Sequence, residues 1–122
     1  AVDGVLEATV EAMEALGARR ADIHAVIGPT ISQAAYEVGP EFFDRFRDEG
    51  PETTRFFANG QGDRMLFDLP GYGLWRLRGA GVGHAEWTGH CTYRDAARFY
   101  SFRRTSHAGE ADYGRLISTI RL

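Results

Sequence analysis

The sequence reads His90-Cys91-Thr92-Tyr93 and, after four further residues, Arg98-Phe99-Tyr100-Ser101-Phe102-Arg103-Arg104. Aromatic residues dominate 98–102, which is typical of a β-strand with one buried face. Because side chains alternate along a strand, a strand over 98–104 places Ser101 and Arg103 on one face and Arg104 on the other. A thiol and guanidinium groups at the end of such a strand can hold an anion. These two stretches are therefore our candidates for a binding site.

The composition is typical of one globular domain spanning residues 1–122, with 43% hydrophobic and 25% charged residues. No stretch approaches the ~18 apolar residues of a membrane span, and a net charge of −3 does not favour nucleic acid as a partner. A single cysteine excludes an internal disulfide and predicts a reducing, cytoplasmic location. The absence of lysine excludes Schiff-base catalysis and a Walker-type phosphate loop.

Hydrophobic periodicity and turn residues predict an α+β fold in which a mixed β-sheet is flanked by helices. Helices are expected over 3–16, 31–36, 40–47 and 68–79, and strands over 22–27, 64–67, 84–88, 98–104 and 115–122. The strand at 22–27 is expected to be buried on both faces, because apolar residues follow one another there. Residues 53–63 carry loop signals, and 105–113 form a polar loop.

The role of Cys91 stays open among three interpretations. It could be a nucleophile whose thiolate is favoured by neighbouring arginines, a residue that lines a binding site, or a small buried packing residue. His90 and Cys91 form the only tight pair of metal-ligand type, but adjacent residues on a strand point to opposite faces. The sequence therefore assigns no metal ligand.

Arg103 is the first choice for binding phosphate or carboxylate, because it shares a strand face with Ser101, whereas Arg104 is expected to pair with a carboxylate. Structural ion pairing remains the alternative for both. The predicted strand that runs into Gly28-Pro29 allows backbone to approach a ligand closely, with a simple turn as the alternative. Glu37 either orders a site by accepting hydrogen bonds or pairs with an arginine.

Several segments, in order, resemble the YfiH-type family, also called the laccase-domain or multicopper polyphenol oxidoreductase family. They are Gly28-Pro29-Thr30-Ile31, Tyr36-Glu37-Val38-Gly39, Cys91-Thr92, Phe99–Arg104 and Gly114-Arg115. The resemblance covers essentially the whole chain and implies a YfiH-like, cysteine-hydrolase type of fold. It also implies that the chain is the C-terminal portion of a longer protein, whose missing N-terminal half would be its partner. The loop at 105–113 is longer than the family pattern.

The resemblance implies that the complete protein is a zinc-dependent purine nucleoside phosphorylase. Its substrates would be adenosine, inosine or methylthioadenosine with phosphate, and it would also deaminate adenosine. The family's zinc ligands, two histidines and a cysteine, belong to the missing half, so none is placed on this chain. An amidase that edits peptidoglycan precursors and a copper polyphenol oxidase remain alternatives. A non-enzymatic alternative is a structural half that is inactive without its partner.

We therefore expect one wall of a cleft here, with the metal-bearing wall outside this polypeptide. Cys91 and Arg103 are the predicted catalytic residues. The predicted substrate-binding residues are Gly28, Pro29, Tyr36, Glu37, Thr92, Ser101, Arg104 and Arg115.

Overall fold

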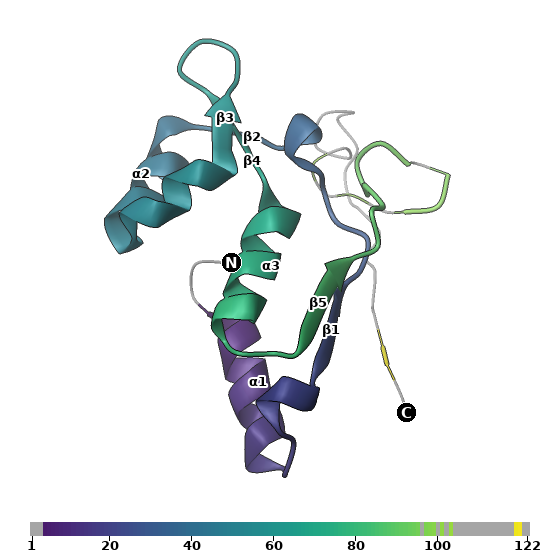
Figure 1. The fold of residues 1–122 in the computed structure, drawn as a ribbon. Helices are drawn as coiled ribbons and strands as arrows, with labels where there is room; N and C mark the ends of the chain where they lie inside the picture. Colours follow the sequence, from purple (N-terminus) through teal and green to yellow (C-terminus); the bar gives the residue numbers. More distant parts are fainter. Residues whose placement is uncertain (1–3, 96, 100, 102, 104–118, 121–122) are drawn as a thin grey trace.

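A computed structural model of the chain describes residues 4–95, 97–99, 101, 103 and 119–120, and it contains helices packed against two small β-sheets (Figure 1). One sheet is parallel and joins β1 (His24–Ile27) to β5 (His84–Trp87). The other is antiparallel, in the order β2 (Glu37–Val38), β4 (Met65–Phe67) and β3 (Phe57–Asn59). The α+β class is confirmed. The single mixed sheet is not, because the parallel and antiparallel strands described here belong to separate sheets.

Two helices, α1 (Val5–Ala15) and α3 (Leu69–Gly79), lie on the same side of the parallel sheet (Figure 1). The apolar residues of α1 recur at helical spacing, and Val10 is 3% exposed where it packs inward. It meets Leu77 of α3 and Ala85 of β5 in one buried cluster, which Ile23 closes from the end of the short 3₁₀ helix η1 (Arg20–Asp22). This cluster holds the parallel sheet against its helices.

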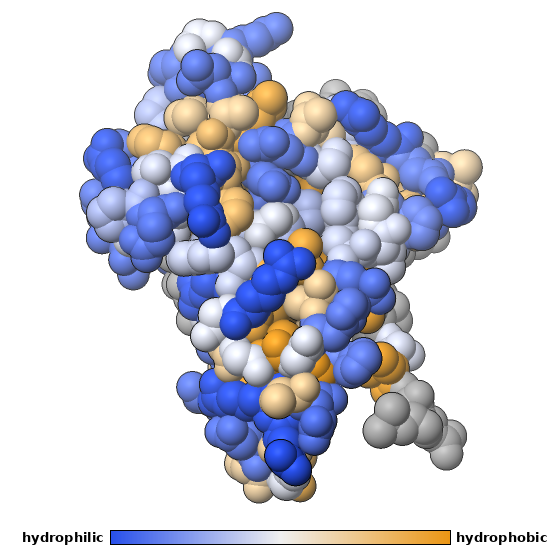
Figure 2. Space-filling model, viewed as in Figure 1, coloured by the Kyte–Doolittle hydropathy of each residue, from blue (hydrophilic) through white to orange (hydrophobic). Residues whose placement is uncertain are grey.

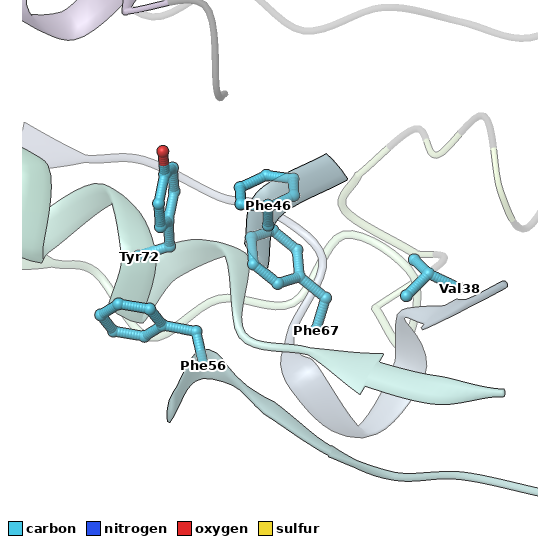
Figure 3. Close-up of a cluster of buried hydrophobic side chains, with 5 residues drawn as sticks. All are labelled: Val38, Phe46, Phe56, Phe67 and Tyr72. Atoms are coloured by element: carbon cyan, nitrogen blue, oxygen red, sulfur yellow. The ribbon is translucent and has the colours of Figure 1, made fainter. Parts of the chain in front are cut away.

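An aromatic cluster forms the second core, between the antiparallel sheet, α2 (Pro40–Glu49) and η3 (Pro51–Phe56). Pro40 occupies the first turn of α2, where its missing N–H costs nothing. In Figure 3 the rings of Phe46 and Phe67 lie next to each other at a tilt of 48°, and their centroids are 4.9 Å apart. The buried members of this cluster are Val38, Phe46, Phe56, Phe67 and Tyr72.

The helix α3 belongs to both cores and fixes one relative to the other. Asp68 caps its N-terminus by accepting a hydrogen bond from the N–H of Gly71 at 3.0 Å. Tyr72, 1% exposed, packs in the aromatic cluster, whereas Leu77 packs on the parallel sheet. A second link is Gln33 in η2 (Gln33–Ala35). Its side-chain amide donates to the backbone carbonyls of Phe56 and Leu66 at 3.3 Å each.

Two predictions about strands are wrong. The strand β1 is not buried on both faces, because His24 and Val26 are exposed and only the alternate residues face the helices. Residues 53–63 are not simply a loop, because they contain part of η3 and the strand β3. Residues 60–64, which follow Asn59, connect β3 to β4, so the turn signals marked a hairpin.

The strand predicted at 98–104 is not formed by the described residues of that range. The N–H of Phe99 donates to the Asp95 carbonyl at 3.0 Å, and the Asp95 side chain accepts from the Arg98 guanidinium, so the chain turns here. Ser101 lies outside helices and strands, and Arg103 has helical conformation. Most of the strand predicted at 115–122 lies outside the described residues.

The helices of the described residues are short or polar. None of the helices there has both the length and the apolar character needed to cross a bilayer. In the space-filling view, hydrophilic residues cover most of the visible face and hydrophobic ones lie in small patches between them (Figure 2).

Candidate functional site

The segments that follow the two parallel strands lie side by side beyond the carboxyl ends of β1 and β5. The N–H of Thr30 donates to the His90 carbonyl at 3.1 Å, and the N–H of Thr92 donates to the Thr30 carbonyl at 3.0 Å. These bonds form an isolated parallel bridge between Thr30 and Cys91. The carboxyl end of parallel strands is where ligands commonly bind in α/β sheets. The Gly28-Pro29 turn and the Cys91-Thr92 pair thus meet at this end of the sheet.

The Cys91 thiol is held by Ser32, a residue that the sequence analysis missed. The sulfur accepts hydrogen bonds from the Ser32 N–H at 3.3 Å and from the Ser32 hydroxyl at 3.2 Å. Burial of the thiol disfavours its charged form. Hydrogen bonds from Ser32 and from the backbone of Arg94 and Tyr93 outweigh burial, and the pKa of the Cys91 thiol is lowered. Among the described residues, the groups that lower the pKa of this thiol are therefore the Ser32 hydroxyl and backbone N–H groups, and the Arg103 side chain is not one of them.

Replacing Ser32 by alanine is expected to raise the pKa of Cys91, because it removes a hydrogen bond that favours the thiolate. The rate of alkylation by iodoacetamide, followed from pH 5 to 10, should then reach half its maximum at a higher pH than in the original chain. Thr54→Ala is a matched control, since it removes a hydroxyl that only donates to the Pro51 carbonyl. An unchanged midpoint in Ser32→Ala would contradict the role given to Ser32.

Arg103 lies against the second upstream motif. Its guanidinium carbon is 5.1 Å from the centroid of the Tyr36 ring, and its Nη1 donates to the Glu37 carbonyl at 3.1 Å. A cation above an aromatic face is attracted by the negative face of the ring. The partner that Glu37 offers to Arg103 is a backbone carbonyl, so Arg103 is not neutralised there by a carboxylate.

The Glu37 carboxylate has a different partner. Its Oε1 is 3.8 Å from Nε of Arg64, and both side chains are partly exposed. This contact is the ion-pairing alternative that the sequence left open for Glu37.

Thr92 and Ser101 are 8% and 7% exposed. Arg104 and Arg115 lie outside the described residues.

One segment, residues 28–37, contacts both the Cys91 thiol and the Arg103 guanidinium. It contributes Ser32 to the thiol and Tyr36 and Glu37 to the arginine, although Cys91 and Arg103 are 59 and 66 residues further along the chain than their partners. Of the ten predicted site residues, eight are described, and each of the eight belongs to this segment or to 91–103. Ser32 follows the Gly-Pro-Thr-Ile motif directly, and that position was the only signal that could have found it.

The described residues do not provide a metal site. None of them gathers three or more histidine, cysteine, aspartate or glutamate side chains in an arrangement that could hold a metal ion. The His90 ring instead lies 5.5 Å from the Phe99 ring. Zinc or copper would therefore need ligands beyond the described part of the chain.

Two surface hollows elsewhere share Trp75 and Arg76, with volumes of about 410 and 300 Å³. Arg76 pairs there with Glu7 and donates to the Tyr72 hydroxyl at 2.5 Å. The hydrogen bond to Glu7 raises the pKa of the arginine, although burial opposes it. This contact ties α1 to α3 and is structural.

Sequence and structure comparisons agree on one group of relatives. The chain is 37% identical to a purine nucleoside phosphorylase of Pseudomonas aeruginosa and 40% identical to one of Deinococcus radiodurans. These matches cover 87% and 93% of this chain but 43% and 42% of the relatives. The chain thus spans about two-fifths of their length.

Solved structures give the same result. The crystal structure of a Neisseria meningitidis protein matches with a TM-score of 0.76 at 34% identity, over 84% of this chain and 41% of that one. The YfiH protein of Bacillus licheniformis matches with a TM-score of 0.76 at 27% identity, over 86% and 41%. The profile of the family described as multi-copper polyphenol oxidoreductase laccase matches residues 1–122. The chain belongs to this family.

Proposed function

We propose that this chain is the part of a purine nucleoside phosphorylase that binds phosphate and nucleoside. The observation that carries the proposal is the similarity to two phosphorylases over nearly the whole of this chain. Because the chain spans less than half of those relatives, the activity is proposed for a complete protein that also contains the remaining portion.

Arg103 is proposed to position the phosphate. A guanidinium binds phosphate through paired N–H groups, and the bond to the Glu37 carbonyl uses only one of its donors. The Tyr36 ring and the Glu37 carbonyl restrict the orientation of the guanidinium, so less conformational freedom is lost when an anion binds. Arg104 and Arg115 are proposed to support anion or substrate binding.

The nucleoside is proposed to lie along residues 28–37 and 91–101. Gly28 and Pro29 would let the backbone approach it closely, and Tyr36 offers an aromatic face. Glu37, Thr92 and Ser101 would contribute polar contacts. Cys91 is proposed to line this site, where its thiol accepts hydrogen bonds from Ser32. The phosphate anion that Arg103 positions would stabilise the oxocarbenium-like state that forms at the anomeric carbon.

The proposed reaction is a displacement at that carbon. A phosphate oxygen forms a bond to C1′ of the ribose while the bond from C1′ to the purine nitrogen breaks. The bonding electrons go to the purine, which takes up a proton and leaves, and ribose 1-phosphate is the second product. Holding phosphate and nucleoside in line is the main contribution expected of this chain. Zinc is proposed as the cofactor, with ligands outside the described residues.

The test compares the isolated chain with the complete protein. Each is assayed with adenosine, phosphate and zinc, and adenine and ribose 1-phosphate are measured. We expect phosphate-dependent release of both products by the complete protein and none by the chain alone. Turnover by the isolated chain would contradict the proposal that the active site also needs the remaining portion of the protein. If the complete protein oxidises a phenol when copper is bound and shows no phosphorolysis, the polyphenol oxidase alternative replaces this proposal.

A further inference from the structure

Among the residues that the structure describes, the two-stranded parallel sheet has one exposed face. The register pairs His24 with His84 and Val26 with Glu86, so these four side chains share one face. All four are exposed, and Val26 is 48% exposed. The opposite face carries Ala25 and Ile27, which pack against α1 and α3 (Figure 1).

An open face is unusual for strands of this kind. Parallel sheets occur almost only with both faces covered, and two strands alone are marginally stable in water. The antiparallel sheet of the same chain needs no such cover, because antiparallel sheets tolerate water on one side. The feature to be explained is therefore the exposure of Val26 between two histidines and a glutamate on β1 and β5.

The matched relatives are much longer than this chain. The matched phosphorylases extend over more than twice the length that this chain spans, since it covers 43% and 42% of them. A protein of that length contains enough additional polypeptide to form another layer on the sheet.

We propose that the open face of β1 and β5 is the surface on which the remaining portion of the full-length protein packs. The polypeptide that docks there must place an apolar side chain on Val26. It must also supply hydrogen-bond partners for the histidine pair, whose ring centroids are 5.4 Å apart, and for Glu86, which already lies 3.5 Å from His84. The inference rests on one part of the proposed function, namely that this chain belongs to a longer protein. It does not depend on the reaction.

The probe is the polypeptide that the Deinococcus radiodurans phosphorylase carries outside the 114 matched residues, co-expressed with this chain. We expect the two to co-purify. Modification of His24 and His84 by diethyl pyrocarbonate, followed by mass spectrometry, should be at least about tenfold slower in the complex than in the isolated chain. This measurement uses the unaltered chain, so it does not depend on whether a variant folds.

A pair of variants locates the surface. Val26→Asp places a charge on the open face and should lower recovery of the complex about tenfold. Ala58→Asp places the same charge at an exposed position of β3 in the other sheet and should leave recovery unchanged. Circular dichroism of each isolated variant confirms that it is folded.

Several results would overturn the proposal. These are failure to co-purify, a complex in which both histidines react as fast as before, and equal loss of complex in the two variants. Slow modification in the isolated chain would show that its own residues cover the face. Self-association abolished by Val26→Asp would identify a second copy as the occupant. A protected complex without phosphorolysis would refute the proposed function and leave this surface assigned.

Discussion

Arg103→Ala in the complete protein is expected to raise the phosphate concentration needed for half-maximal rate by about ten- to a hundredfold. A hydrogen bond to a charged group contributes about 1.5–3 kcal/mol, and about 1.4 kcal/mol corresponds to a factor of ten. The effect should appear in the KM for phosphate more than in the KM for nucleoside, because the guanidinium is assigned to the anion alone. Steady-state kinetics with each substrate varied in turn measures both values.

Stability separates this role from a structural one. Arg103 stacks on Tyr36 and donates one hydrogen bond to the Glu37 backbone, so its loss should lower the free energy of unfolding by only about 1 kcal/mol. Arg47→Ala is the matched control, since Arg47 also lies over an aromatic ring, that of Phe43, and pairs with Asp44 on the surface. It should leave the phosphate KM unchanged. An Arg103→Ala protein with a normal phosphate KM would rule out the assignment.

Phe67→Ala is expected to lower the free energy of unfolding by about 3–5 kcal/mol. The side chain is fully buried, and its ring lies within 6 Å of the rings of Phe42, Phe46, Phe57, Tyr36 and Tyr72. Alanine there leaves a cavity at the centre of the aromatic core. Domains of this kind are stable by about 5–15 kcal/mol, so the loss is a large part of the total.

Urea denaturation followed by tryptophan fluorescence measures this loss, because Trp75 packs against the aromatic core. Phe43→Ala is the control. Its ring contacts Phe57 at 5.1 Å from the edge of the cluster and is only partly buried, so the expected cost is about 1 kcal/mol. Equal losses in the two variants would mean that the aromatic core is not centred on Phe67.

Local signals predicted several elements well. Pro40 lies within the first turn of α2 and Asp68 caps α3, and both features could be predicted because capping and proline geometry depend only on neighbouring residues. The same locality explains the errors. The turn residues Asn59-Gly60 predict a loop, but the segments on either side of them pair as β3 and β4. Strand pairing depends on residues on the other side of the turn, so local signals do not show it.

The candidate site was predicted only in part. The sequence predicts the two motifs that carry Cys91 and Arg103, and the upstream segment that contains Gly28 and Tyr36, as candidates, and the structure places Tyr36 against Arg103. The partnership of Cys91 with Ser32 was not, because the two residues are 59 positions apart and a serine by itself carries no site signal. The described residues of the range 98–104 do not form the expected strand, and hydrogen bonds to Asp95 turn the chain before Phe99.

By itself the sequence determined the α+β class, the family resemblance, the start of α2, the cap of α3 and the residue types available for an anion site. These follow from periodicity, local backbone chemistry and motif order. Only the tertiary structure decided that the sheets are separate, that one segment contacts both the thiol and the arginine, and that one face of the parallel sheet is open. Contacts of this kind join residues far apart in the chain, and their energies depend on packing that no local pattern encodes.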